Sequence, residues 1–552
     1  MKVIIFGISF WCFVSLVRAE TFPAAGLLPK RETGVLKILK DHPEYDGRGI
    51  KVAIFDSGVD PGAEGLGRTS DGRLKVIDLV DATGSGDIDI SKEASVDGGE
   101  VVGLTGRRLT LPKGIDDGAS VRLGIKAAWE LFPSALVSRL KKERAETFRE
   151  EHKKIEVSVR QDSALSKKER DARLKELASA MKGYKDPGPI FDCVVYQDNE
   201  IWRVLVDTDE DGDLAEEKAL ADYRHEHEYA SFGEQAQLNY TVTLDDAGRG
   251  LAIVVPANMH GTHVSGIVGG YYESEPDLNG LAPGVQVVSV KIGDTRLGGM
   301  ETGSAVIRGL EVARAHGCQL INMSYGEPTR LPNRGRILEK INELVYEHGV
   351  IFVSSAGNAG PALSTLGSPG GTTSSVIGVG AYVTPAMMKA GYAMRRTHPD
   401  LAYTWSSRGP AKDGSLGVSV CAPGGAYSPV PAYTLLRNQH ANGTSMSSPN
   451  ACGSLAVLLA GLEAEDIAYS PSSVKRVIEH TAEPLDQEEV FAEGQGLLRV
   501  DRALELLRED AVPTEPRYSV RVPGRDNARG LYLRESYDTE AAQPFSVSVT
   551  PV

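Results

Sequence analysis

Short apolar runs rich in β-branched residues alternate with helical patterns from residue 285 onward. Buried strands are predicted at residues 285–292, 318–324, 349–354 and 374–380. Between them, apolar residues spaced for one helix face predict helices at 303–316 and 337–348. Such alternation is typical of an α/β fold, in which helices cover both faces of a parallel sheet. We therefore expect functional side chains at the carboxyl ends of these strands.

A different pattern occupies residues 106–250. Its first half, 127–182, is strongly charged and helical, and one helical face carries Leu174, Leu177, Ala178 and Met181. No heptad persists for three repeats, so a coiled coil is not predicted. The pattern predicts a solvated helical hairpin lying on the core.

Both ends of the chain differ from its centre. Lys2 precedes an apolar run at 3–17, and small residues follow near Ala19, which is typical of a secretory signal peptide and too short to span a membrane. An uncleaved anchor and a misassigned start codon remain alternatives. Near the other end, strand patterns appear at 518–522 and 545–550.

These patterns divide the chain into six segments. We predict a signal peptide (1–19), an N-terminal extension (20–44), a catalytic domain in two parts (45–105 and 251–510), a charged helical insert with an acidic turn (106–250) and the start of a β-rich C-terminal region (511–552).

Composition narrows the function. The net charge of −15 argues against nucleic acid as a partner. Apart from Cys12, the cysteines are widely spaced without a metal-binding pattern, which predicts buried free thiols at Cys193, Cys318, Cys421 and Cys452. The signal pattern predicts a secreted or periplasmic protein.

The run Gly443-Thr444-Ser445 carries the strongest chemical signal. It leads into an apolar helical pattern at 451–462, so Ser445 is predicted at a helix N-terminus, where free N–H groups favour negative charge. A nucleophilic serine needs such a place when an oxyanion forms beside it. Alone, however, the run could be an ordinary helix cap.

Three further motifs favour catalysis. Asp56 follows a buried strand pattern, and His260 opens a small-residue helix in Asn258-Met259-His260-Gly261-Thr262-His263. In a Ser-His-Asp triad, Ser445 would attack the carbonyl, His260 would carry the proton, and Asp56 would orient the imidazole. Asn358 follows another strand and could donate to the oxyanion together with the Ser445 N–H.

The order Asp56, His260, Ser445 is that of subtilisin, and the motifs resemble the subtilisin-type serine peptidases, specifically their tripeptidyl-peptidase II branch. The resemblance covers about residues 22–552. The matching runs include Gly26-Leu27-Leu28-Pro29-Lys30, Met300-Glu301-Thr302-Gly303, Ser324-Tyr325-Gly326-Glu327 and Thr404-Trp405-Ser406-Ser407-Arg408-Gly409-Pro410.

This resemblance implies a subtilisin-like sheet and an exopeptidase that releases tripeptides. Glu301 and Glu327 match two family glutamates that bind the free N-terminal ammonium of the substrate. The resemblance also implies a homo-oligomer built through a longer C-terminal region, family inserts that shape assembly and access to the active site, and a cytoplasmic location as the alternative to export.

The insert contains an acidic turn in which Asp207, Asp209, Asp211 and Asp213 alternate around Gly212. This spacing resembles the first half of a calcium loop, but Lys218 stands where the final glutamate would be, so a metal-free acidic turn remains the alternative. His225 and His227 lack a third ligand, and His263 is interpreted as a packing residue. No cofactor is required by the predicted chemistry.

Three functions follow, in order of preference. The first is a tripeptide-releasing serine exopeptidase, the second a broad endopeptidase of the same fold, and the third a non-catalytic fragment that binds peptides or supports assembly. Only about 25 residues separate the signal from the catalytic core, too few for an inhibitory prodomain. Restricted substrate access, as in an exopeptidase, would limit such an enzyme.

Overall fold

The computed structural model describes residues 24–294, 296, 299–486, 488–509, 518–523, 528–533, 536–540, 542 and 544–551. The predicted signal peptide lies outside these residues. Within them, every helix is too short or too polar to cross a bilayer.

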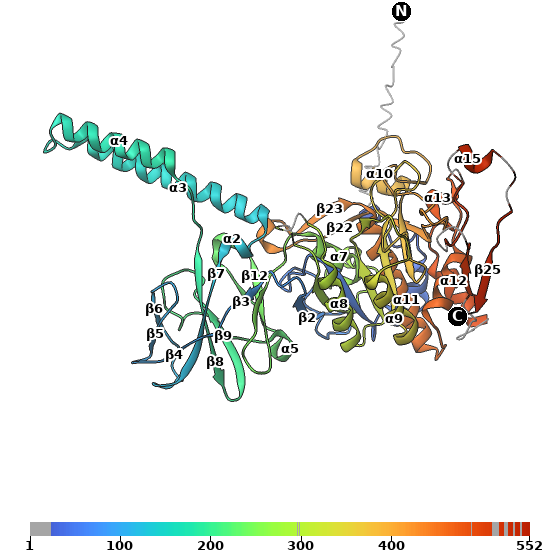
Figure 1. Ribbon diagram of the computed structural model, residues 1–552, viewed down its shortest axis with the longest axis horizontal. Coiled ribbons are helices and arrows are strands. Elements are labelled where there is room, and N and C mark those ends of the chain that lie inside the picture. The colour runs from blue at the N-terminus through green and yellow to red at the C-terminus, as the bar shows by residue number, and fades with distance from the viewer. Residues whose placement is uncertain are drawn as a thin grey trace, which may run out of the picture.

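A twisted sheet of eight described strands forms the centre of the larger lobe, on the right in Figure 1. Its parallel strands, in spatial order, are β2 (Val76–Asp81), β14 (Gln286–Lys291), β1 (Lys51–Asp56), β15 (Leu320–Met323), β17 (Ile351–Ser355), β19 (Val376–Val383) and β21 (Val420–Pro423). The short strand β20 (Leu401–Ala402) pairs antiparallel with the end of β19. The predicted α/β sheet is confirmed, and all four predicted strands belong to it.

Helices cover both faces of this sheet. One face carries α8 (Gly303–Ala315) and α9 (Arg336–His348), and the other carries α1 (Val35–Asp41), α7 (His260–Gly269), α11 (Thr444–Ala464), α12 (Pro471–Thr481) and α14 (Val500–Glu509). Side chains of β1 alternate between the faces: Ile54 packs with the α11 side and Phe55 with the α8 side. The rings of Phe55 and Phe352 form a T-shaped pair with 6.3 Å between their centroids.

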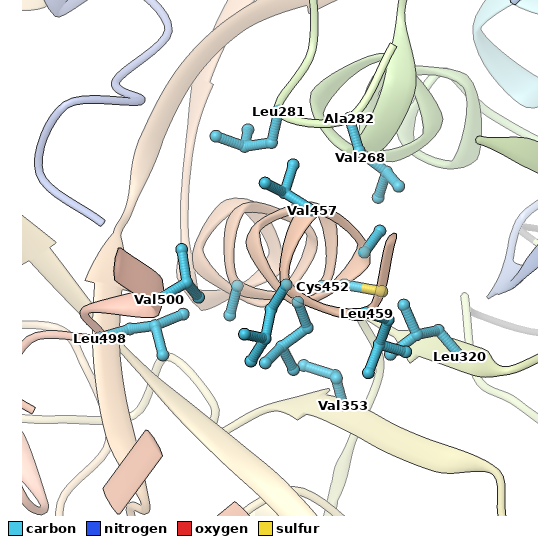
Figure 2. Close-up of a cluster of buried hydrophobic side chains, with 14 of the residues drawn as sticks. Val268, Leu281, Ala282, Leu320, Val353, Cys452, Val457, Leu459, Leu498 and Val500 are labelled. Atoms are coloured by element: carbon cyan, nitrogen blue, oxygen red, sulfur yellow. The ribbon is translucent and has the colours of Figure 1, made fainter. Parts of the chain in front are cut away.

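Helix α11 is buried along most of its length, because it runs through the core rather than over it. Figure 2 shows Cys452, Val457 and Leu459 of this helix pointing in different directions. Their neighbours come from the α7 region, the sheet and the start of α14 with the residues just before it. The labelled ones are Val268, Leu281, Ala282, Leu320, Val353, Leu498 and Val500. Apolar residues around the whole helix are typical of such full burial, and this packing fixes the N-terminus at Ser445.

The insert forms the second lobe together with residues 87–102 and 251–254, which were predicted to belong to the catalytic domain, and this lobe is richer in strands than its charge pattern indicated. One sheet contains β4 (Lys92–Ser95), β7 (Ser120–Ala127), β8 (Ile190–Asp198), β9 (Ile201–Val206) and β10 (Leu220–Ala221). A second contains β3 (Asp87–Ile88), β11 (Ala230–Ser231), β12 (Asn239–Leu244) and β13 (Leu251–Val254), and β5 (Glu100–Val102) pairs with β6 (Arg108–Thr110). Short helices α2 (Ala128–Leu131), α5 (Tyr223–Glu226) and α6 (Gly233–Ala236) complete the lobe.

The predicted helical hairpin exists, but its predicted position on the core was wrong. Helices α3 (Ser134–Gln161) and α4 (Lys167–Gly183) project away from both lobes (Figure 1). Of α3 only Leu136 and Leu140 are buried, and α4 buries no residue. Most positions of both helices are charged or polar, and the described contacts of α4 are mainly with α3. Leu174, Leu177 and Met181 are half-buried, whereas Ala178 is exposed.

The remaining described elements are short. They are the strands β16 (Glu327–Pro328), β18 (Gly367–Ser368), β22 (Gly425–Pro429), β23 (Asn438–Asn442), β24 (Tyr518–Arg521) and β25 (Ser548–Pro551), and the helices α10 (Pro385–Tyr392), α13 (Val490–Glu493) and α15 (Ser536–Thr539). Strands are present near both positions that the pattern predicted, and the structure pairs β24 and β25 antiparallel. That they begin a larger β domain stays a prediction.

Candidate active site

Asp56 ends β1 and is fully buried between β14 and β15. Its Oδ1 accepts a hydrogen bond from the backbone N–H of Ser57 at 2.7 Å, and the Ser57 hydroxyl oxygen lies 3.1 Å away. Nδ1 of His260 lies 2.9 Å from both carboxylate oxygens. The carboxylate is thus fixed by its neighbours and faces the imidazole.

Close backbone approach brings His260 to this carboxylate. A Cβ at Gly261 would lie 2.4 Å from the carbonyl oxygen of Gly58, so only glycine lets α7 begin here. The side chain of Asn258 accepts from the backbone N–H of His260 at 2.8 Å and from the Ser57 hydroxyl at 2.8 Å. One amide therefore joins the start of α7 to the loop after β1.

The charge state of His260 follows from these contacts. Burial disfavours the imidazolium, but the negative charge of Asp56 and its hydrogen bond outweigh burial and raise the pKa of His260 above its ordinary value. With Nδ1 donating to Asp56, the neutral ring presents Nε2 as a proton acceptor. The pair has the chemistry of an oriented general base.

Ser445 lies in the first turn of α11 and is half-buried. Its hydroxyl donates to the carbonyl oxygen of Ser324 at 3.3 Å, and among the hydrogen bonds of the described residues none joins it to His260. Two consecutive residues connect them instead. The Ser324 hydroxyl donates to the carbonyl oxygen of Ser445, and the Tyr325 ring forms a T-shaped pair with the His260 ring at 6.0 Å between centroids. Catalytic hydrogen bonds often tighten only when substrate is bound.

Asn358 is held against the residue before Ser445. Its Oδ1 accepts from the backbone N–H and from the hydroxyl of Thr444, each at 2.9 Å. Since the oxygen is occupied in this way, the amide NH₂ group of this exposed side chain remains available as a donor. Asn358 and the N-terminus of α11 can therefore donate to one oxyanion.

Glu301 and Glu327 line the same cavity, which has a volume of about 460 Å³. Glu327 is exposed in β16, which pairs with β18. Glu301 is half-buried, and its Oε2 is buried without a hydrogen-bond partner among the described residues. Burial, with a smaller contribution from the charge of Glu327, raises the pKa of Glu301. The two carboxylates together form a site suited to a cation.

Comparison with known proteins places this chain in a family. The model of the subtilase family matches residues 47–497. Subtilisin DY of Bacillus licheniformis is 32% identical over 253 residues, which is 45% of this chain and 77% of the subtilisin. The chain belongs to the subtilase family.

Other subtilases are more similar over a longer range. Tripeptidyl-peptidase 2 of Oryza sativa subsp. japonica is 44% identical across 95% of this chain, and that of Drosophila melanogaster is 40% identical across 97%. A crystal structure of tripeptidyl peptidase 2 superposes with a TM-score of 0.73 at 35% identity over 95% of the chain. These relatives confirm the resemblance to the tripeptidyl-peptidase II branch. The chain spans about two fifths of their length.

Several residues of this subtilase site were not identified from the sequence. Ser57, Asn258, Ser324 and Tyr325 each contact a predicted catalytic residue or the residues that hold it. Asn258, Ser324 and Tyr325 lie inside quoted motifs, and Ser57 directly follows Asp56 in the chain. Their proximity to the motif residues was the available signal, but which side chains meet depends on contacts between distant segments.

The acidic turn gathers three of its four predicted carboxylates. Ligand atoms of Asp207, Asp209 and Asp211 lie within 4.8 Å of one another, whereas Asp213 accepts from the backbone N–H of Ala215 instead. The guanidinium of Arg107 donates to Asp207 at 2.8 Å and to Glu210 at 2.7 Å. Because this cation already neutralises the buried Asp207, the turn fits an ion-pair network better than a calcium site.

Two other predictions concern cysteines and histidines. The four described cysteines are buried and free, which confirms the prediction. Burial raises the pKa of Cys318 to about 12, so this thiol is unreactive. Buried His263 bonds through Nε2 to the carbonyl oxygen of Gln439, and burial lowers its pKa to about 4, as suits a neutral packing residue.

Proposed function

We propose that this chain is a serine exopeptidase that releases tripeptides from the free N-termini of peptides. The observation that carries the proposal is the pair Glu301 and Glu327 on one cavity next to the Ser324–Glu327 segment. Relatives named tripeptidyl-peptidase 2 support it over nearly the whole chain.

The proposed reaction is acyl transfer. Ser445 attacks the scissile carbonyl while Nε2 of His260 takes the hydroxyl proton, and Asp56 stabilises the imidazolium that forms. The oxyanion of the tetrahedral intermediate accepts from the Asn358 amide and from the backbone N–H of Ser445. His260 then gives its proton to the leaving amine, and water hydrolyses the acyl-enzyme by the same steps.

The length of the product follows from the spacing of these groups. Ser324 touches Ser445, and Glu327 stands three residues further along the same segment, which spans at most about 10 Å. Three residues of substrate cover the same length. An ammonium at the end of a tripeptide would therefore reach the carboxylates of Glu301 and Glu327 while the third carbonyl lies at Ser445.

The acidic pair also opposes internal cleavage. A peptide that continues past the third residue would bring an amide, with no charge, against carboxylates that lose solvent. Leaving a charged group desolvated and unpaired costs about 1–3 kcal/mol or more in binding free energy. Such a penalty disfavours the endopeptidase alternative without blocking the catalytic residues.

Matched substrates test the proposal. Ala-Ala-Phe joined to a fluorogenic amine should be cleaved with a free N-terminus and resist cleavage when acetylated, and Ser445→Ala should be inactive on both. Equal cleavage of both substrates would support the broad endopeptidase. Cleavage of neither would support the non-catalytic fragment.

Location and assembly are also proposed. The pattern at residues 1–19 supports export, and cell fractionation with N-terminal sequencing of the mature chain would distinguish it from a cytoplasmic location. Homo-oligomerisation through a longer C-terminal region is proposed from the resemblance alone. Sedimentation of the chain with and without such a region would test it.

A further inference from the structure

Helix α11 contains a proline one turn after Ser445. The backbone N–H of residue 449 would normally donate to the carbonyl oxygen of residue 445, but Pro449 has no N–H. The proline ring also crowds the carbonyl four residues before it. The carbonyl of Ser445 is therefore left out of the regular helical hydrogen-bond ladder.

Ser324 supplies the donor that the helix lacks. Its hydroxyl donates to the carbonyl oxygen of Ser445 at 3.0 Å, and in return the Ser445 hydroxyl donates to the carbonyl oxygen of Ser324 at 3.3 Å. Ser324 follows directly after β15 at the carboxyl edge of the sheet. This reciprocal pair ties the first turn of α11 to the sheet.

A buried amide fixes the Ser324 hydroxyl in turn. Asn322 is fully buried in β15, and its Nδ2 donates to Oγ of Ser324 at 3.0 Å. Its Oδ1 accepts from the hydroxyl of Ser448, on α11, at 2.7 Å. Since Asn322 donates to Ser324, the hydrogen of the Ser324 hydroxyl is free to point at Ser445. The orientation of this hydroxyl is thus determined by the core.

We propose that Ser324, oriented by Asn322, is a positioning residue that holds Ser445 for attack in place of the hydrogen bond removed by Pro449. The inference rests on the proposed role of Ser445 as nucleophile. Holding the Ser445 carbonyl fixes the peptide plane that follows this residue, which limits the motion of the Cα that carries the nucleophilic hydroxyl.

The same contact links the nucleophile to the segment that leads to the cavity lined by Glu301 and Glu327. Ser324 opens the segment that continues through Tyr325 to Glu327. A single residue therefore fixes both the nucleophile and the start of the segment that carries one of the proposed ammonium ligands. Its loss should affect the chemical step more than the binding of substrate.

The test uses the rate at which phenylmethanesulfonyl fluoride modifies Ser445, measured by peptide mapping, together with kcat and KM on Ala-Ala-Phe-amine substrate. Ser324→Ala should lower the modification rate and kcat about ten-fold, which is the scale of one hydrogen bond, with KM nearly unchanged. Ser324→Thr keeps the hydroxyl and should restore most of the loss. Ser454→Ala is the matched control, because it removes a buried α11 hydroxyl that bonds to Asn450 and Thr33 instead.

Pro449→Ala provides the decisive variant. It returns an N–H that can bond the Ser445 carbonyl, so the double variant Ser324→Ala/Pro449→Ala should recover at least threefold over Ser324→Ala. The inference would be overturned if the two substitutions changed the modification rate and kcat independently, so that the double variant showed the product of the two single effects. It would also be overturned if Ser324→Ala left the modification rate unchanged. If wild-type Ser445 is not modified at all, the nucleophile itself is wrong and the proposed function fails with it.

Discussion

Nδ1 of His260 lies 2.9 Å from both carboxylate oxygens of the fully buried Asp56. Asp56 comes from the end of β1 and His260 from the start of α7, 204 residues later. The folded insert separates them in sequence, yet the contact Gly58–Gly261 brings their backbones together. The charge of Asp56 raises the pKa of His260 against the effect of burial.

A pH dependence follows from this pair. The proposed general base works only when neutral, so activity should fall as the pH falls through the His260 pKa. Because that pKa is raised, the midpoint of the acidic limb of kcat/KM should lie above about 6.5. Asp56→Asn should move the limb to lower pH and reduce kcat about 10⁴-fold. A limb that stays in place would mean that another group controls it.

Asn358 gives a second prediction, with a matched pair of variants. Asn358→Ala should lower kcat by about 10²–10³ with little change in KM, because its NH₂ group would act on the transition state. Asn358→Asp keeps an oxygen for Thr444 while removing the donor, so it should lose at least as much activity but less thermal stability. A change mainly in KM would place Asn358 in ground-state binding.

The motifs were predictable because each is local. The strand before Asp56, the helix after Ser445 and the turn before Asn358 all follow from short apolar patterns and small residues. The contacts between motifs were not predictable in this way. That Ser324 compensates for Pro449 depends on where β15 lies beside α11, which is a property of the packed sheet.

In the insert, even the local elements were predicted only in part. Its charged helices dominated the pattern, although strands β7, β8 and β9 form much of the lobe. The hairpin was expected on the core, but α4 contacts α3 and the two helices project together from the lobes (Figure 1). An amphipathic pattern shows that a helix has a partner without identifying the partner.

The acidic turn gives a third prediction. Arg107 reaches buried Asp192 and Asp207 as well as Glu210, so removing its charge would leave two buried carboxylates without their cation. Arg107→Ala should therefore destabilise the chain by about 3–5 kcal/mol, visible as a lower Tm. Chelator should leave the Tm of the wild type unchanged. A chelator-sensitive Tm that Asp211→Ala abolishes would instead establish a calcium site.

The last prediction concerns the acidic pair, and Glu327→Gln keeps the shape of the side chain while removing its charge. A charge-assisted hydrogen bond to an ammonium is worth roughly 2–3 kcal/mol, so kcat/KM for a free-amine substrate should fall on the order of 30–150-fold. Hydrolysis of the acetylated substrate should stay the same or improve, since one repelling carboxylate is gone. An equal loss on both substrates would assign Glu327 a structural role.

Glu301→Gln is the variant matched to Glu327→Gln. The pH dependence of KM and kcat/KM separates the titration of Glu301 from the titration of the substrate ammonium. Burial and the charge of Glu327 raise the Glu301 pKa, so KM for the free-amine substrate should rise as the pH falls through that value. Above about pH 8 the substrate ammonium itself loses its proton, and kcat/KM should decline again. The acidic rise in KM should vanish in Glu301→Gln, because glutamine does not titrate, while the alkaline decline should weaken as the charge contact is lost. A KM profile identical to that of the wild type would show that Glu301 does not bind the ammonium, even if Glu327 does.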